Sequence, residues 1–217
     1  MTHGSRASLL AVTLLIAALA GCGLETYESR LKATTLLYQH YQVLNENLGP
    51  VWESGPITLR VPQQFVEIPA PKPPEAPKEA GAEPPPPPPD TRKPTQPPLE
   101  LNGLRAAFKA DLTVDGGSKQ PGFIYVLSNY DFTKDQKDMF GPLTREIANA
   151  FHLNIDEKTW KSEQYPERAT EAFPGMVYNA ANLTPQDVEG PPRRVSIYLN
   201  KQGEVETAIV MILPQKL

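Results

Sequence analysis

Cysteine and histidine side chains readily act as nucleophiles or metal ligands, and this chain of 217 residues contains few of them. Its single cysteine, Cys22, excludes an internal disulfide and any zinc cluster built from several cysteines. Beyond the first 22 residues the histidines are His40 and His152, which lie on different predicted elements without a second histidine at ligand spacing. The sequence therefore predicts no metal site and no cofactor.

Two catalytic or metal-binding patterns begin in the sequence but are not completed. Ser29 and Lys32 have the serine–lysine spacing of penicillin-binding enzymes, but the companion motifs are absent. The segment Asp111–Gly116 matches the start of a calcium loop, yet the position that needs a bidentate acid is Gly122. We therefore predict no catalytic residue. Whether the chain is an enzyme stays uncertain, and a non-enzymatic role is favoured.

The N-terminal residues have the pattern of an export signal. Arg6 and the amino terminus precede an uncharged apolar run, Leu9–Ala20. This run is short for a membrane-spanning helix, which needs roughly 17–25 residues, but it has the length of the apolar region of a signal peptide. The pattern predicts that Met1–Gly21 is a signal peptide. The alternative is an uncleaved membrane helix in which the cysteine is buried and inert.

Leu19, Ala20, Gly21 and Cys22 resemble the lipobox of bacterial lipoproteins. The resemblance implies that the Cys22 sulfur carries a diacylglycerol with acyl chains such as palmitate, and that a signal peptidase cuts before it. It places the protein on a membrane of the bacterial envelope, facing the periplasm or the exterior. Gly23, where some family members have aspartate, resembles outer-membrane sorting, although the choice of membrane stays open. The whole chain also resembles uncharacterised planctomycete lipoproteins, which implies no activity.

Composition excludes some classes of protein and divides the chain into parts. The net charge is −4 and no basic excess is available to bind nucleic acid. Of 25 prolines, 14 lie in residues 69–98, including the unbroken run Pro84–Pro89. This tract has no large apolar side chain and is predicted to be disordered. Residues 99–217, in contrast, have the apolar content of a folded domain.

The proline-rich tract has three possible roles. As a spacer of thirty residues in polyproline II conformation, it would reach on the order of 90 Å and lift a domain from the membrane. As a surface loop, it would leave and rejoin one domain whose first strand is Ile57–Val61. As a ligand, it would occupy an aromatic groove on a partner.

The residues after Cys22 predict a helix followed by an extended segment. Leu24, Leu31 and Tyr38 repeat every seven residues within Gly23–Leu48, and Gly49-Pro50 is a typical helix stop. Such a helix either packs on its own domain or forms a short coiled coil or partner-binding helix beside the membrane. Residues 22–49 are therefore predicted to form an anchored amphipathic helix, and residues 50–68 an extended segment that contains one strand.

Hydrophobic patterning in residues 99–217 predicts an α+β domain. Strands are expected at Leu104–Val114 and Gly122–Tyr130, joined by a turn at Asp115–Ser118. The hairpin Arg194–Asn200 and Glu204–Leu213 follows later in the chain, and its apolar run from Ala208 is typical of a central strand.

The segments between these strands predict one or two helices that cover an antiparallel sheet. Thr133 and Gln136 have capping-box spacing, and a second helix after Gly141-Pro142 carries an apolar stripe of Leu143, Ile147 and Phe151. Asn154–Arg168 is predicted to be a loop, and Thr170–Asn179 to contain a short strand. This order of elements resembles the Mog1/PsbP-like family.

Together these features predict a membrane-anchored envelope lipoprotein that acts as a non-enzymatic binding or structural module. The expected partners are the membrane, through the lipid, and an envelope protein, but not nucleic acid. The alternative is a hydrolase or a small-ligand-binding domain. A deep pocket that brings together Tyr125, Tyr130 or Tyr178 with acids of shifted pKa would favour that alternative. A flat sheet face with exposed aromatic side chains would favour the binding module.

Overall fold

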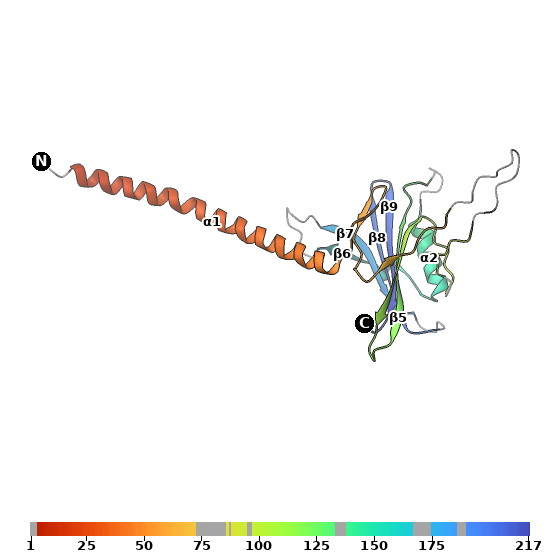
Figure 1. Cartoon of the computed structure of the whole chain (residues 1–217). Helices are drawn as coiled ribbons and strands as arrows, with labels where there is room; N and C mark the ends of the chain where they lie inside the picture. The colour runs from red at the N-terminus through yellow and green to blue at the C-terminus, as the bar shows by residue number, and fades with distance from the viewer. Residues whose placement is uncertain are drawn as a thin grey trace, which may run out of the picture. The chain divides into compact units, whose positions relative to one another are not determined.

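The structure is a computed structural model that describes residues 4–72, 86, 88–94, 97–132, 138–166, 175–185 and 190–217. These residues form two units: a helical unit within Met1–Leu48 and a sheet-containing unit within Gly49–Leu217 (Figure 1). The predicted mixture of helix and mostly antiparallel sheet is confirmed.

The first unit is one long helix, α1 (Gly4–Asn47). It ends one residue before the predicted Leu48 but begins much earlier than the predicted Gly23. The apolar run Leu9–Ala20 consists largely of leucine and alanine, which are strong helix formers, and no proline interrupts it. Within the described part of the chain, no helix is long and apolar enough to cross a membrane.

The second unit contains a seven-stranded sheet in the order β3-β4-β5-β9-β8-β7-β6, in which all neighbours are antiparallel. The strands are β3 (Val66–Glu67), β4 (Leu104–Thr113), β5 (Lys119–Ser128), β6 (Lys161–Tyr165), β7 (Met176–Leu183), β8 (Arg193–Gln202) and β9 (Val205–Pro214). The two predicted hairpins are present, β4–β5 and β8–β9. Strand β9 lies at the centre of the sheet, as its apolar run from Ala208 predicts.

Helix α2 (Phe140–Ala150) covers one face of this sheet (Figure 1). The predicted stripe is confirmed, because Leu143, Ile147 and Phe151 are all buried. They pack against inward-facing side chains such as Tyr125 and Val210 from the central strands. The predicted capping box at Thr133 and Gln136 lies outside the described residues.

A small hairpin covers part of the opposite face. It consists of β1 (Trp52–Ser54) and β2 (Ile57–Leu59), which pair with each other and not with the larger sheet. Ile57, Val61 and Phe65 are buried against β4 and β5. The predicted strand Ile57–Val61 therefore ends two residues early, and the neighbouring Pro62, which has no backbone N–H, cannot extend the pairing.

The chain on both sides of the proline-rich tract belongs to the same unit. Before the tract, β3 pairs with β4, and the Ile68 N–H donates to the Ala107 carbonyl. After the tract, Leu99 and Leu101 are buried in the core under α2. These contacts agree with the loop alternative, in which the tract leaves and rejoins one unit.

The last part of the tract is held against β4. The Arg92 guanidinium forms an ion pair with Asp90 at 2.7 Å and donates to the Arg105 carbonyl at 3.2 Å. The hydrogen bond from Arg92 lowers the pKa of the Asp90 carboxyl below its ordinary value of 3.8. Arg92 thus contacts the unit directly, whereas the prediction of disorder for residues 73–85, 87, 95 and 96 lies outside the described residues.

The prediction of a loop over Asn154–Arg168 is wrong. It contains the short 3-10 helix η2 (Glu157–Thr159), which the Asp156 side chain caps, and the edge strand β6. Strand β6 was not predicted because its sequence, KSEQY, lies at an exposed edge and has no apolar alternation. The strand expected within Thr170–Asn179 is present as β7, which begins at Met176 and continues beyond that segment to Leu183.

A buried carboxylate joins the two layers. Glu206 of β9 is only 5% exposed, and one of its oxygens accepts from the backbone N–H groups of Met139 at 2.9 Å and Phe140 at 3.3 Å. The other oxygen accepts from Lys201 Nζ at 3.0 Å. Because the first N–H groups of a helix have no partner inside the helix, Glu206 caps α2 from a neighbouring strand.

Replacing this carboxylate should destabilise the fold. We expect Glu206→Ala to lower the free energy of unfolding by about 2–3 kcal/mol, because two buried N–H groups lose their acceptor. The control Glu53→Ala, at an exposed position of β1, should change it by less than about 0.5 kcal/mol. Urea unfolding followed by circular dichroism measures both. Equal effects of the two variants would contradict a capping role for Glu206.

The ion pair between Asp90 and Arg92 should contribute to the free energy of unfolding in a pH-dependent way. Because the folded-state pKa of Asp90 is lowered, its stabilisation is present above the unfolded-state pKa and is lost as the pH falls through the folded-state value. We expect Asp90→Asn to cost up to about 1 kcal/mol at pH 7, with the difference from the parent chain shrinking below about pH 4. The control is Asp115→Asn in the exposed turn. A difference that is constant from pH 7 to pH 3 would contradict this assignment.

Candidate functional site

The three tyrosines singled out from the sequence lie in different places. Tyr125 is fully buried in the core, where burial raises the pKa of its hydroxyl and the described residues supply no hydrogen-bond partner. Tyr130 lies under the guanidinium of Arg105, 3.9 Å from its ring centroid, and Arg105 pairs with Asp131. Tyr178 lies on β7. The structure therefore does not bring the three tyrosines together in one pocket.

Tyr178 instead belongs to a cluster that sequence analysis did not identify. Tyr165 on β6, Tyr178 on β7 and Tyr198 on β8 have ring centroids 6.1 to 6.3 Å apart, with interplanar angles of 59° to 88°. The strand register produces this cluster, because Glu163 pairs with Tyr178 and Ala180 pairs with Tyr198. Residues two apart share a face of a strand, so all three rings lie on one face. We call these three residues the tyrosine surface.

The tyrosine surface is on the side of the sheet opposite α2. The neighbours of Tyr198 along β8, Ile197 and Leu199, are buried in the core under α2, so Tyr198 points the other way. Tyr165 is 47% exposed, and nearby Met176 is 42% exposed. Exposed aromatic and sulfur-containing side chains that gather on one sheet face are typical of a contact surface for a partner.

Two hydroxyl groups of the tyrosine surface, those of Tyr165 and Tyr178, act as hydrogen-bond donors. The Tyr165 hydroxyl donates to Glu163 at 2.6 Å, and this bond raises its pKa above the ordinary value of 10.0. Burial raises the pKa of Tyr178, whose hydroxyl donates to the Met176 sulfur at 3.3 Å. At neutral pH both are neutral phenols, which suit stacking and hydrogen bonding rather than nucleophilic attack.

A groove with a volume of about 210 Å³ lies beside the tyrosine surface. Residues 56–59 of the β1–β2 hairpin form one wall. The sheet side contributes Tyr178, Asn200, Gln202, Thr207 and Ile209. The groove therefore combines an aromatic ring and apolar side chains with amide and hydroxyl groups, which suits an extended ligand that has both apolar groups and carbonyl acceptors.

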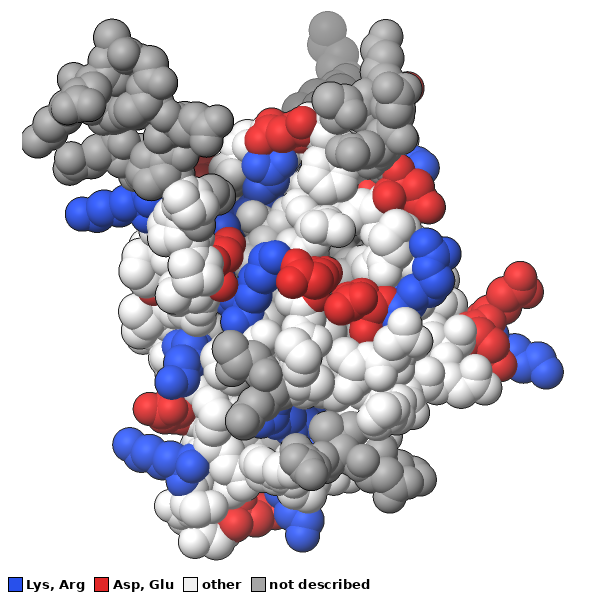
Figure 2. All heavy atoms as spheres, turned by 90° about the vertical axis from the view of Figure 1, so that its right-hand side faces the viewer, with Lys and Arg blue, Asp and Glu red and all other residues white. Residues whose placement is uncertain are grey.

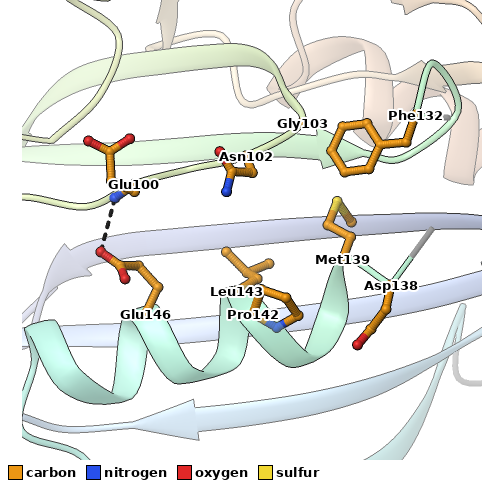
Figure 3. Close-up of a pocket in the computed structure, with 9 residues that line it drawn as sticks. All are labelled: Glu100, Asn102, Gly103, Phe132, Asp138, Met139, Pro142, Leu143 and Glu146. Atoms are coloured by element: carbon orange, nitrogen blue, oxygen red, sulfur yellow. Dashed lines mark hydrogen bonds between the residues drawn. The ribbon is translucent and has the colours of Figure 1, made fainter. Parts of the chain in front are cut away.

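A second cavity, of about 490 Å³, lies beside α2 (Figure 3). Figure 3 shows Glu100 and Glu146 at one end and Asp138 at the other, so the carboxylates do not converge. Glu100 is paired with Lys93, Glu146 accepts from the Glu100 backbone N–H at 3.1 Å, and Asp138 accepts from Gly141. Among the described residues, no group of three potential ligands could hold a metal ion.

The surface on the α2 side carries mixed charge. Figure 2 shows acidic and basic side chains interspersed over this side, and within its described residues neither sign forms a broad patch. The ion pair between Lys93 and Glu100 is one example of opposite charges that lie next to each other. A surface of this kind has no extended field to attract a polyanion or a polycation.

The lipobox residues lie within α1. The backbone of Leu19, Ala20, Gly21 and Cys22 is helical in the chain that still carries its first 21 residues. Of the two histidines considered as ligands, His40 lies on α1 and His152 follows α2, where its positive φ of 51° ends the helix. The acylation of Cys22 stays a prediction from the sequence.

No protein family model, curated protein or solved structure matches this chain in the comparisons made. The resemblances to bacterial lipoproteins and to Mog1/PsbP-like domains therefore stay predictions. Tyr165 and Tyr198 were missed for a different reason. Their cluster depends on the register of three strands, one of which was predicted to be a loop, and no spacing in the sequence marks it.

Proposed function

We propose that this chain is a membrane-anchored envelope lipoprotein whose sheet-containing unit binds a partner through the tyrosine surface. The observation that carries the binding role is the cluster of Tyr165, Tyr178 and Tyr198 on one sheet face, in which Tyr165 is 47% exposed and the other two side chains are half-buried. Tyrosine is enriched at protein interfaces because its ring offers a large apolar contact while its hydroxyl keeps a hydrogen bond.

The surroundings of the cluster also suit a binding surface. The groove beside Tyr178 has a wall from the β1–β2 hairpin and carries the amides of Asn200 and Gln202. Polar groups around an aromatic centre orient a partner and contribute specificity, while the aromatic rings supply most of the affinity. Two of the tyrosine hydroxyls donate to groups on their own strands, Tyr165 to Glu163 and Tyr178 to the Met176 sulfur.

The anchor in this proposal is the lipid on Cys22, supported by the Leu19-Ala20-Gly21-Cys22 sequence. Two or three acyl chains hold a protein on a membrane far more firmly than one chain does. The 25 residues Gly23–Asn47 continue as helix, which is about 38 Å long at 1.5 Å per residue. Along the sequence, this helix lies between the acylated residue and the unit that carries the tyrosine surface.

A second candidate function is small-ligand binding in the cavity beside α2. Its volume of about 490 Å³ is in the usual range for small-molecule sites, and it joins apolar side chains such as Leu143 to the amide of Asn102. This candidate is weaker, because the carboxylates around the cavity already have partners.

The anchor is tested by mass spectrometry of the native protein. We expect an N-terminal Cys22 carrying diacylglycerol, and we expect Cys22→Ser to move the protein from the membrane fraction to the soluble fraction. Ser29→Ala, seven residues later on α1, is the matched control and should stay membrane-bound. A free thiol together with an intact leader would overturn the anchored location.

The binding role is tested by capture of envelope components on the purified chain. We expect Tyr165→Ala to reduce capture of a specific component at least about tenfold, because an exposed ring at the centre of a contact surface is removed. The control Tyr38→Ala removes a tyrosine from α1 that is more exposed than Tyr165, at 71% against 47%. Quantitative mass spectrometry compares the two. Equal capture by both variants would count against the tyrosine surface.

A further inference from the structure

The seven-stranded sheet has two edge strands, which differ in how much of the edge they leave open. At one edge, β3 has only two residues, Pro69 follows it closely, and Trp52 Nε1 donates to Glu67 of this strand at 3.1 Å. At the other edge, β6 has five residues and, among the described residues, pairs only with β7. An edge strand of this length presents backbone N–H and C=O groups that can pair with another strand.

We propose that β6 pairs with β6 of a second copy of this chain, in an antiparallel arrangement that joins the two sheets edge to edge. A twofold axis between the strands lets each copy offer and receive the same contact. Addition of a strand at an open edge is a common mode of protein recognition. The contact is made by the edge of β6 and not by the tyrosine rings, so the inference goes beyond the proposed function.

The charges of β6 select the register of this pairing. A twofold axis perpendicular to the sheet places one residue opposite its own copy, and near the middle of β6 that residue is Ser162 or Glu163. With Glu163 at the centre, two carboxylates lie directly opposite each other, which is unfavourable. With Ser162 at the centre, Lys161 of each copy lies opposite Glu163 of the other, and two cross-strand ion pairs form.

Both charged side chains can make this contact. Among the described residues, Lys161 is exposed and has no ion-pair partner. One Glu163 oxygen accepts from the Tyr165 hydroxyl at 2.6 Å, and its other oxygen can accept from Lys161 of the second copy. A lysine on an edge strand deters pairing with most strands but permits pairing with a strand that places an acid opposite it. The charges therefore make the edge selective for its own sequence.

The backbone on both sides of Ser162 is suited to a ladder. Trp160, with φ of −84° and ψ of 134°, is already extended, whereas Thr159 still belongs to the 3-10 helix η2. In the selected register Trp160 lies opposite Gln164 of the second copy, so residues 160–164 of each chain form the ladder. Backbone groups point alternately to the two sides of a strand, and the ladder contains about four to six hydrogen bonds, depending on which set faces outwards.

This pairing joins the two tyrosine surfaces on one continuous face. Lys161, Glu163 and Tyr165 share a face of β6, and Glu163 pairs with Tyr178 in the register of β6 and β7. The cross-strand ion pairs therefore lie on the same face as the rings of both copies. An edge contact is small, but under the proposed function anchoring in one membrane raises the effective concentration of the two copies.

The first experiment tests the register by disulfide formation. The protein is the full-length chain in detergent with Cys22→Ser, so that an introduced cysteine is the only thiol. We expect Ser162→Cys to form an intermolecular disulfide under mild oxidation, because opposite residues of an antiparallel pair have Cα atoms about 4.5–5.5 Å apart. The matched control is Gln164→Cys. Its two copies are offset by about 13 Å along the strands, so non-reducing electrophoresis should show cross-linking at least about tenfold slower.

The second experiment reverses charges in the same Cys22→Ser chain and measures self-association by sedimentation equilibrium. We expect the parent chain to dimerise with a Kd between about 1 µM and 1 mM. Lys161→Glu and Glu163→Lys should each weaken dimerisation at least about tenfold, because like charges then lie opposite each other. Lys119→Glu, at an exposed position of β5, is the control for net charge and should dimerise like the parent.

Recovery of the dimer distinguishes charge pairing from damage to the fold. A mixture of the Lys161→Glu and Glu163→Lys variants should form a heterodimer, because each acid then lies opposite a lysine. The double variant should recover for the same reason. Circular dichroism checks that each variant is folded, and the Ser162→Cys and Gln164→Cys comparison stays valid if a charge reversal unfolds the chain.

Three results would overturn the inference: a parent chain that is monomeric up to about 1 mM, single charge reversals that dimerise like the parent, or a Gln164→Cys variant that cross-links as fast as Ser162→Cys. None of these results decides the proposed function, which is tested by capture that depends on Tyr165. Conversely, loss of that capture together with an intact β6 dimer would refute the tyrosine surface and leave the edge pairing in place.

Discussion

The buried carboxylate of Glu206 is the interaction that joins the helix layer to the sheet. A charge that is 5% exposed must be paired, and here it accepts from the start of α2 and from Lys201. The Glu206 backbone N–H donates to the Asn129 side chain at 2.8 Å, and the Glu206 backbone carbonyl accepts from the Ser128 hydroxyl. One residue on the central strand thus determines where α2 begins and ties the end of β5 to the same point.

Placing α2 on one face leaves the other face for the β1–β2 hairpin, which is too small to cover it. The hairpin packs over β4 and β5, where Phe108, Ile124 and Val126 are buried. The part of that face on β6 and β7 keeps Tyr165 and Met176 exposed. The tyrosine surface therefore lies on the part of this face that the β1–β2 hairpin does not cover. The groove lies at the edge of the hairpin.

Much of the fold could be predicted because long apolar patterns mark the central strands and α2. Phe123–Leu127 and the Leu143–Ile147 stripe are examples. The surface could not be predicted, since its members come from three strands and only the register brings them together. The role of Glu206 could not be predicted either. A glutamate in an alternating strand sequence is expected to face solvent, and only the position of α2 shows that it is buried as a helix cap.

Under the proposed function, the two attachments of the proline-rich tract change which segment joins the anchored residue to the sheet-containing unit. A spacer lengthens a chain only when its ends lie on different bodies. Here β3 and Arg92 both attach to β4, so a longer or shorter tract leaves the path from Cys22 to the sheet unchanged. That path is the helix Gly23–Asn47, whose length is set by its backbone hydrogen bonds. The tract therefore does not lie between Cys22 and the sheet along the chain, and under the proposed function it is not a spacer.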